Sequence, residues 1–449
     1  MNLPKEFLKS LPLPESEILE FQNSLDEELK SSFRLNPSKA KPAFGFEKVP
    51  WSKHGFYLDK RPRFTSNPPF HAGAFYAQEA SSMFISHVLE DVGINSKPIV
   101  ALDLCAAPGG KTTLLQSELH KHSLIQANET IQSRFKVLIE NTTKWGVPNI
   151  CVSNCDPARF SGLDNFYDLI LVDAPCSGEG LFRKQKNAVE HWSIRAVEHC
   201  SARQKRILAD IWPSLKKDGL LIYSTCTYNR LENEENLKWL KSRNDLEFLN
   251  IDISGLKGIQ EVNDGGVIGY RFFPHLVQGE GFFCSVIRKQ DGVKVKRNKT
   301  KKFKLKILKS FQTHHEFLKD GQVYAGQEEQ IENLEILLSH FEKSIKPGLE
   351  LGKLLKGSVL YDHGMAMINN NDEQDIEQIL LGLGDALKYL KKEDVSMNKP
   401  RGRYIIQFNE FNLGFAKSDQ RRLISQYPKN WRILKSSEEE YTPLVRPLK

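Results

Sequence analysis

The chain has 449 residues, 40% hydrophobic and 27% charged, which is the balance of a globular protein of about three domains. It carries a formal net charge of +7, an excess that is compatible with a polyanionic partner without requiring one. No stretch approaches the roughly 20 apolar residues of a membrane-spanning helix, and the N-terminus lacks the apolar core of a signal peptide. We therefore expect a cytoplasmic protein that does not cross a membrane.

The N-terminal region, residues 1–90, mixes short elements. The apolar spacing predicts a helix over 15–31, a loop rich in proline and aromatic residues over 37–69, and a second helix over 78–89.

Residues 91–290 alternate short apolar strands with helices, which predicts an α/β domain with a doubly wound parallel sheet in the strand order 3-2-1-4-5. An antiparallel pair at 271–274 and 281–288 closes this domain. The predicted parallel strands are 99–104, 124–128, 150–153, 167–172 and 220–224, and the predicted helices are 111–122, 130–145 and 188–212. Such sheets bind ligands at the carboxyl ends of their strands, and each unusual motif of this domain lies at such an end.

A basic segment follows, with eight Lys or Arg residues and no acid between Lys294 and Lys306. It lies in a linker over 291–312 and is either a solvated connection or a phosphate-contacting strip. Residues 313–449 combine short strands, glycine turns and a helix near 373–390, which indicates a compact, mostly β accessory domain.

The first strand of the central domain ends in the glycine-rich turn Pro108-Gly109-Gly110. Glycines let a ligand approach the backbone closely, and the N-terminus of the next helix favours an anionic group. A P-loop would require a glycine where Cys105 stands, which argues against an ATP or GTP site despite the Gly110-Lys111-Thr112 that follows.

Two acidic residues end the next two strands. Glu129 is placed to accept hydrogen bonds from ribose hydroxyls, and Asp156 is placed near an adenine amino group. Either acid alone would be interpreted as a cap of its strand, but with the glycine turn they outline a nucleoside pocket.

The chain has seven cysteines, an odd number spread over its length, which argues against a disulfide framework. Cys151 and Cys155 have no second pair at zinc-site spacing, so we expect no metal. Cys176 and Cys226 differ from the others because each lies in a polar turn at the end of a neighbouring strand. We therefore expect these two thiols to open into one cleft.

A pair of thiols suits methylation at carbon 5 of cytosine, an atom that is a weak nucleophile. A thiolate that adds to carbon 6 activates the ring, and a second thiol can assist its release. Asp173, three residues before Cys176, can hydrogen-bond the ring nitrogen at position 3. This chemistry leaves open which cysteine attacks.

At these residues the sequence resembles the Nop/Nol/Sun family of RNA cytosine-5 methyltransferases. The motifs DLCAAPGGKT, DAPCSGEG and STCT occur in the family's order, and segments near 72–83 and 271–283 extend the resemblance over 1–290. It implies a Rossmann-like class I methyltransferase that uses S-adenosylmethionine, with an N-terminal α+β extension that binds RNA.

The resemblance also assigns roles to individual residues. Cys226 is the implied nucleophile and Cys176 the implied releasing thiol, whereas in DNA cytosine-5 methyltransferases the Pro-Cys cysteine attacks. The implied cofactor-binding residues are Cys105, Ala106, Ala107, Pro108, Gly109, Gly110, Lys111, Glu129, Asp156 and Asp173.

Motifs at 351–357, 363–367, 413–417 and 428–432 resemble the C-terminal PUA-like RNA-binding domain of a branch that acts on bacterial ribosomal RNA. They imply a monomer that modifies a cytosine of 16S rRNA in the small subunit, with tRNA as the alternative substrate. A second alternative is a ribosome assembly factor that binds RNA without catalysis. All motif residues are present, which argues against that alternative, and the absence of a long target-recognition insertion argues against a DNA methyltransferase.

Overall fold

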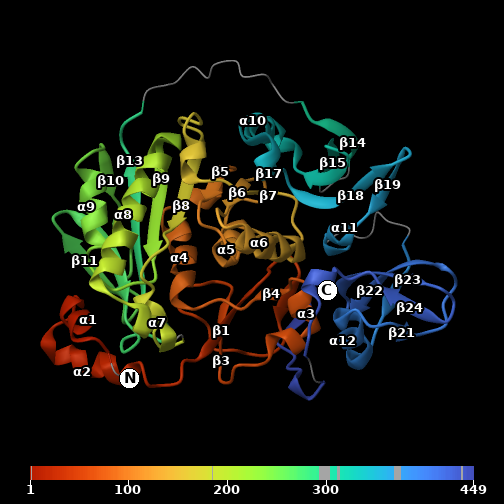
Figure 1. Cartoon of the computed structure of the whole chain (residues 1–449), viewed down its shortest axis with the longest axis horizontal. Helices are drawn as coiled ribbons and strands as arrows, with labels where there is room; N and C mark the ends of the chain where they lie inside the picture. The colour runs from red at the N-terminus through yellow and green to blue at the C-terminus, as the bar shows by residue number, and fades with distance from the viewer. Residues whose placement is uncertain are drawn as a thin grey trace.

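The structure is a computed structural model, and it describes residues 1, 3–184, 186–292, 304–310, 314–368, 376–435 and 438–448. A large central sheet lies beside an N-terminal region and two smaller C-terminal sheets (Figure 1). None of the helices in these described residues is long and apolar enough to cross a bilayer. The predicted basic segment 294–306 falls mostly outside the described residues.

The central sheet has the strand order β11-β12-β13-β9-β8-β5-β6-β7-β17. Its five parallel strands are β5 (Val100–Asp103), β6 (Leu124–Asn128), β7 (Ile150–Ser153), β8 (Tyr167–Asp173) and β9 (Leu215–Thr225). Numbered 1 to 5 along the chain, these parallel strands lie in the sheet in the predicted order 3-2-1-4-5. Its antiparallel strands are β10 (Leu246–Phe248), β11 (Gln260–Asp264), β12 (Val267–Phe272), β13 (Phe282–Lys289) and β17 (Ile345–Lys346).

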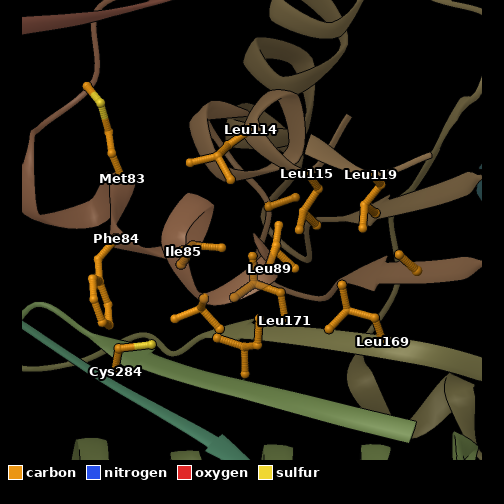
Figure 2. Packing of buried hydrophobic residues seen from close by; sticks show 14 of the residues in the cluster. Met83, Phe84, Ile85, Leu89, Leu114, Leu115, Leu119, Leu169, Leu171 and Cys284 are labelled. Atoms are coloured by element: carbon orange, nitrogen blue, oxygen red, sulfur yellow. The ribbon is translucent and has the colours of Figure 1, made fainter. Parts of the chain in front are cut away.

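Helices cover both faces of this sheet because its strands are apolar on both sides. On one face lie α4 (Phe84–Asp91), α5 (Gly110–Glu118) and α6 (Gln132–Trp145), and on the other lie α8 (Ile194–Ile211), α9 (Glu234–Lys241) and α10 (Ile331–Phe341). Leu169 and Leu171 of β8 pack toward the first group, and Ile170 and Val172 pack toward the second. Figure 2 shows Leu169 and Leu171 beneath the leucines of α5.

The predicted helix over 188–212 is divided in the structure. Lys186–His191 forms the short helix α7, and α8 begins only after Ser193. The Ser193 Oγ accepts a hydrogen bond from the backbone N–H of Ala196, so this serine acts as an N-cap and starts a new helix.

The N-terminal region contains α1 (Lys5–Ser10), α2 (Glu15–Ser24), α3 (Pro68–His71) and a sheet of β3 (Gly55–Leu58), β1 (Ser31–Leu35) and β4 (Phe75–Tyr76). The predicted helix over 15–31 therefore ends early, because residue 31 already begins a strand that pairs with β3. The prediction of a loop over 37–69 is wrong in part, since β3 and α3 lie within it. Both errors arise from pairing between distant segments, which overrides local propensity.

Two sheets make up the described C-terminal part, where the sequence predicted one compact domain. The first has the order β14 (Lys306–Ser310), β15 (His315–Lys319), β16 (Gln322–Gly326), β18 (Leu349–Leu355) and β19 (Ser358–Tyr361). The second has the order β20 (Gln378–Leu380), β22 (Gly402–Phe408), β23 (Phe411–Ser418), β24 (Arg422–Ser425) and β21 (Val395–Ser396). Two further helices, α11 (His363–Met367) and α12 (Leu383–Lys391), lie in this described part in addition to α10.

A pair of short strands joins the N-terminal region to the C-terminal segment. β2 (Ala40–Pro42) pairs in antiparallel fashion with β25 (Val445–Pro447). The C-terminal segment is thereby tied to the N-terminal region (Figure 1).

Candidate active site

A pocket of about 610 Å³ opens at the carboxyl ends of the parallel strands. It contains six of the residues singled out in the sequence: Cys105, Glu129, Asp156, Asp173, Cys176 and Cys226. They come from five different strand ends, and the strand order brings them to one edge of the sheet.

The glycine-rich turn lies next to this pocket and outside its lining. As described, the pocket lining includes Cys105 but not residues 106–111. The turn is fixed to α6, since Ala107 O accepts a hydrogen bond from Arg134 Nη2 (2.6 Å) and Pro108 O accepts one from Asn141 Nδ2 (2.7 Å). Gly109 has a φ of +113°, which only a glycine adopts without strain. The turn therefore forms a rigid wall behind the pocket.

Glu129 offers an unused acceptor. Its Oε1 accepts from the backbone N–H of Ile131 (2.9 Å), while its buried Oε2 has no hydrogen-bond partner among the residues that the structure describes. Arg134 Nη1 lies 3.6 Å from Oε2. A buried carboxylate oxygen without a donor is costly, so this atom is suited to a hydroxyl of a bound ligand.

Asp156 differs from Glu129 in the contacts of its carboxylate oxygens. Its Oδ1 accepts from the backbone N–H of Ala158 (3.1 Å), and its Oδ2 pairs with Arg206 Nη2 (3.1 Å). It lines the pocket, but both oxygens already have partners on the protein.

The two thiols meet. Cys176 follows β8 and Cys226 follows β9, and the register pairs Asp173 with Ser224, so the two strands end level with each other. The Sγ atoms lie 3.2 Å apart, within hydrogen-bond distance for sulfur. The hydrogen bond with Cys226, followed by burial and the negative charges of Cys226 and Glu232, raises the pKa of Cys176 well above its usual range. Cys176 is therefore a thiol at neutral pH.

A lysine and a carboxylate flank the thiols. Lys111 Nζ binds Asp173 Oδ2 (2.7 Å), and Ser224 Oγ donates to Asp173 Oδ1 (2.9 Å). Burial lowers the pKa of Lys111, but attraction to Asp173 and Cys226 outweighs it and leaves this pKa raised. Lys111 thus stays positively charged beside the cysteines.

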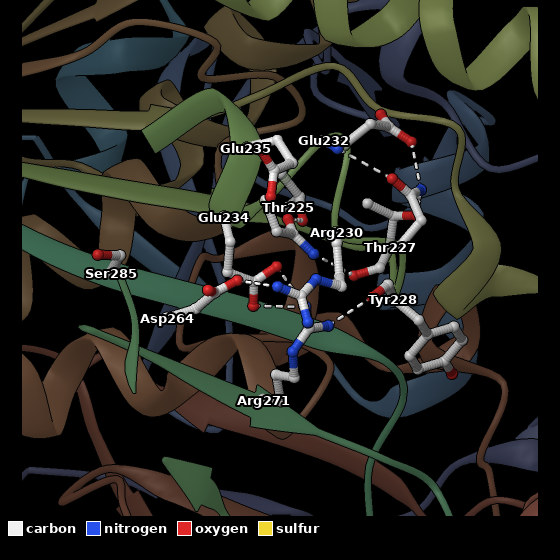
Figure 3. Close-up of polar contacts among 12 residues, drawn as sticks. Thr225, Thr227, Tyr228, Arg230, Glu232, Glu234, Glu235, Asp264, Arg271 and Ser285 are labelled. Carbon is white, nitrogen blue, oxygen red and sulfur yellow. Dashed lines mark hydrogen bonds and ion pairs between the residues drawn. The ribbon is translucent and has the colours of Figure 1, made fainter. Parts of the chain in front are cut away.

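Two buried glutamates hold together the loops that carry the cysteines. Glu232 accepts hydrogen bonds from Ser177 N (3.0 Å), Gln204 Nε2 (2.8 Å) and Asn229 Nδ2 (2.8 Å). Glu179 accepts from Thr227 Oγ1 (2.6 Å) and from two backbone N–H groups beyond it. Figure 3 shows part of this region, with Glu232 at the top of the view, Arg271 at the bottom and Thr227 between them. The loops are therefore fixed relative to each other.

Sequence reasoning missed several residues of this site. Arg203 and Arg206, three positions apart on α8, line the pocket. Their i, i+3 spacing is visible in the sequence, but nothing local shows that this helix face borders the cleft. Glu179 stands within the DAPCSGEG motif, yet its role depends on a distant loop.

Asp103, at the end of β5, was also missed. Its Oδ2 accepts from Thr112 Oγ1 (2.6 Å), and its buried Oδ1 has no partner within the described chain. Burial raises the pKa of Asp103 to about 7. Its contact with Thr112 ties the end of β5 to α5, the helix that follows the glycine turn.

Known proteins share this architecture. Family models described as 16S rRNA methyltransferase RsmB/F, the N-terminal domain of 16S rRNA methyltransferase RsmF and the RsmF PUA domain match residues 95–304, 3–80 and 378–433. Ribosomal RNA small subunit methyltransferase F of Pectobacterium atrosepticum is 35% identical over 312 residues, which are 65% of this chain and 64% of that protein. The matched region thus spans slightly less than two thirds of that relative.

Solved structures agree with the fold. A methyltransferase homologue from Pyrococcus horikoshii is 29% identical with a TM-score of 0.53 and covers 63% of this chain and 93% of its own. NSun6 from Pyrococcus horikoshii, solved with SFG, has a TM-score of 0.52 at 21% identity, covers 64% of this chain and 99% of its own, and supports the fold alone. The expected methyltransferase fold and the C-terminal PUA domain are thereby confirmed. Over residues 3–80, 95–304 and 378–433 the chain is thus similar to the RsmB/F family of 16S rRNA methyltransferases, which belongs to the Nop/Sun family of RNA methyltransferases.

Proposed function

We propose that this protein methylates carbon 5 of a cytosine in 16S rRNA through a covalent cysteine–cytosine intermediate. The observation that carries the proposal is the pair of thiols 3.2 Å apart, in one pocket with the acids expected for a nucleoside cofactor. We further propose that residues 1–90 and 313–449 bind RNA on either side of a catalytic domain over 91–290.

The residues of the pocket fit S-adenosylmethionine. Glu129 has a free buried oxygen for a ribose hydroxyl, and Cys105, Asp156 and Asp173 line the same cavity. When bound there, the cofactor supplies an electrophilic methyl group. The glycine turn and Lys111 lie behind this lining, where Lys111 holds Asp173.

Cys226 is the nucleophile in this proposal. The positive charge of Lys111 interacts with Cys226, and a neighbouring cation suits a cysteine that attacks as a thiolate. This thiolate adds to carbon 6 of the cytosine and leaves carbon 5 electron-rich. As negative charge develops on the ring, nitrogen 3 takes up a proton from water, and Asp173, held by Lys111 and Ser224, accepts a hydrogen bond from this N–H until the proton returns to water on release.

Cys176 then serves the release step. Before attack, the hydrogen bond with Cys226 and its charge keep Cys176 protonated. Once Cys226 is bonded to carbon 6, that charge is gone, so Cys176 loses a proton more readily. Its thiolate accepts the proton from the methylated carbon 5, the carbon 5–carbon 6 double bond forms again, and the bond to Cys226 breaks with its electrons returning to that sulfur. Cys226 is regenerated as a thiolate, and the proton taken from carbon 5 replaces the one that Cys176 released to water, so carbon 5 has exchanged one proton for one methyl group.

Basic side chains at the pocket support an RNA substrate. Arg134, Arg203 and Arg206 line it, and arginine is well suited to bind phosphate. A target base must leave its stack to reach the thiols, and a flanking phosphate would then lie near these arginines.

The proposal is tested by incubating the protein with S-adenosylmethionine labelled in its methyl group and four substrates in separate reactions. These are 30S subunits, naked 16S rRNA, tRNA and duplex DNA. We expect label in 16S rRNA, on 5-methylcytosine after digestion to nucleosides. Label in tRNA alone would favour the alternative substrate, and no label in any RNA would refute the proposal.

A further inference from the structure

A second pocket, of about 360 Å³, lies where three parts of the chain meet. The C-terminal half of α6, the segment from β18 to α11, and the loop after β24 each contribute residues to its lining. α11 lies beside α6 and packs against it (Figure 1). We call this cavity the junction pocket.

The floor of the junction pocket carries an unsatisfied histidine. His363 is buried, and neither ring nitrogen has a hydrogen-bond partner in the described part of the chain. Its ring is fixed edge-on to Tyr427 (centroids 5.3 Å apart) and Trp431 (5.1 Å). It also packs so closely on Gly414 that an added Cβ would lie 2.7 Å from its Nδ1.

This histidine is neutral. Burial, followed by the positive charges of Lys144 and Lys39, lowers the pKa of His363 to about 3. Gly414 occupies the Nδ1 side of the ring, which leaves Nε2 as the ring atom available to a base in the pocket. In a neutral imidazole Nε2 is either a donor or an acceptor, and a nucleobase edge can complement either one. Leaving this atom unpaired in the interior is costly, so a polar ligand in the pocket would relieve that cost.

The rim of the pocket is aromatic and basic. Trp431 is half-buried and offers part of its ring to the cavity, while Lys429 and Asn430 beside it are exposed. Bases stack on exposed aromatic rings without strict sequence preference, and lysine attracts the phosphate that follows a base. The lining also includes two carboxylates with partners on the protein: Glu350 pairs with Lys346, and Asp362 accepts from the backbone N–H of His363. The aromatic wall and the cationic rim together suit a nucleotide.

One face of α6 connects this pocket to the catalytic one. Ile131, at the start of the helix, lines the catalytic pocket, and Ile139 lines the junction pocket. Phe135 lies between them at the i, i+4 spacing of a single helix face and is partly buried. The distance from Arg134 to Thr142 along the helix is about 12 Å at ~1.5 Å per residue. At ~3.4 Å per stacked nucleotide this corresponds to three or four nucleotides.

We propose that the junction pocket binds an unstacked base of the same RNA, a few nucleotides from the target cytosine. The inference rests on the proposed function, because it assumes an RNA substrate. The junction pocket is then a second site of base recognition, formed by the methyltransferase domain and the C-terminal part together. This second contact determines where along the RNA strand the enzyme binds.

Photochemical cross-linking tests this placement without relying on activity. 30S subunits reconstituted with 16S rRNA that contains 4-thiouridine are bound to the protein, irradiated, and digested for peptide analysis. We expect cross-linked peptides from the segment that contains Lys429 and Trp431. Cross-links confined to other segments would overturn the inference.

Substitutions at the rim of the junction pocket test how much this contact contributes to RNA binding. Trp431→Ala should raise KM for the RNA on the order of tenfold, the loss expected for one stacked base, with kcat and the affinity for S-adenosylmethionine unchanged. Trp431→Phe retains an aromatic face and should retain most of the affinity. The matched control is Trp239→Ala, since Trp239 is also half-buried but lies on α9 outside both pockets.

Lys429→Ala provides a variant that does not disturb the core, because Lys429 is exposed. It should weaken RNA binding and reduce its dependence on salt, whereas Lys435→Ala, on an exposed residue outside the pocket lining, should not. If the wild-type protein methylates no RNA, the proposed function fails. If it methylates RNA but the Trp431 and Lys429 variants keep the wild-type KM, the junction pocket alone is refuted.

Discussion

Cys176 and Cys226 are the same residue type and lie 3.2 Å apart, yet their surroundings differ. A lysine charge acts on Cys226, whereas the nearby Glu232 adds negative charge on the side of Cys176. Chemistry alone permits either thiol to attack. The asymmetry of charge favours attack by Cys226 and supports the roles implied by the family resemblance.

Single-cysteine variants test this division of roles. Cys226→Ala should abolish methyl transfer, because no adduct can form at carbon 6. Cys176→Ala should form the adduct but fail to release it, and a denaturing gel should then show RNA that migrates with the protein. Turnover near the wild-type rate in Cys226→Ala would reverse the assignment, and a Cys176→Ala protein that releases its RNA freely would remove Cys176 from the release step.

The influence of Glu232 on Cys176 can be measured without RNA. Glu232→Gln keeps the hydrogen-bonding shape but removes a negative charge, so the pKa of Cys176 should fall and its alkylation by iodoacetamide at fixed pH should become several-fold faster. Mass spectrometry of the labelled peptide reads this rate at each cysteine. Glu235→Gln serves as the control, since Glu235 pairs with Lys238 at the surface. An unchanged alkylation rate in Glu232→Gln would show that this carboxylate does not tune the thiol.

The loop that follows β9 is held in place by contacts with neighbouring helices and strands. The loop after β9 leads into α9, and Arg271 of β12 binds Glu234 at the start of that helix at 2.5 Å. Arg271 also donates to the backbone oxygen of Tyr228 (Figure 3). Both side chains of the ion pair are almost fully buried, with 3% and 1% exposure. This pair therefore ties the loop that carries Cys226 to the antiparallel edge of the sheet.

Breaking this pair should be costly. Arg271→Leu leaves Glu234 buried without its partner and should destabilise the protein by about 3–5 kcal/mol, seen as a lower thermal midpoint. Replacing both residues, as in Arg271→Leu with Glu234→Leu, should restore part of that loss. A single Arg271→Leu variant with the wild-type midpoint would show that the pair contributes little.

The whole molecule is held together by contacts between its N-terminal and C-terminal parts. β2 pairs with β25, Arg63 Nη1 binds Glu440 Oε1 (2.9 Å), and the His71 ring lies 3.3 Å from the Tyr427 hydroxyl. These contacts join elements of the N-terminal region to the second C-terminal sheet. Acid is expected to weaken this interface.

The pH dependence follows from two buried histidines. Burial, followed by the charge of Lys144, lowers the pKa of His71 to about 3, and His363 is shifted to a similar value. The unfolded chain, with a histidine pKa of about 6.5, then binds more protons than the folded protein between these values. Stability from these residues is therefore full above pH ~6.5 and is lost as the pH falls toward ~3.

Thermal midpoints at about pH 7.5 and about pH 5 check this expectation. The wild-type midpoint should be lower at the acidic pH, and His71→Gln, which cannot gain a proton on unfolding, should show a smaller decrease. His191→Gln is the control, because His191 is exposed on α7. An equal decrease in wild type and His71→Gln would mean that other groups set the acid sensitivity.

The sequence by itself determined the parallel sheet, its strand order and the position of each motif at a strand end. These features could be predicted because apolar runs, glycine turns and the alternation of strands with helices are recognisable from residues that are close together in the sequence. It failed where distant pairing decided the outcome. Residue 31 begins a strand because it pairs with β3, and the C-terminal strands separate into two sheets because β18 pairs with β16 and β19, whereas β22 pairs with β20 and β23.

Only the tertiary structure decided the details on which the chemistry depends. The 3.2 Å between the thiols, the buried Glu232 behind them and the arginines of α8 all require loops and helices far apart in the chain to meet. The junction pocket likewise exists only where three segments converge. Hydrogen-bond distances and burial depend on how these segments pack together, and residue spacing along the chain does not specify that packing.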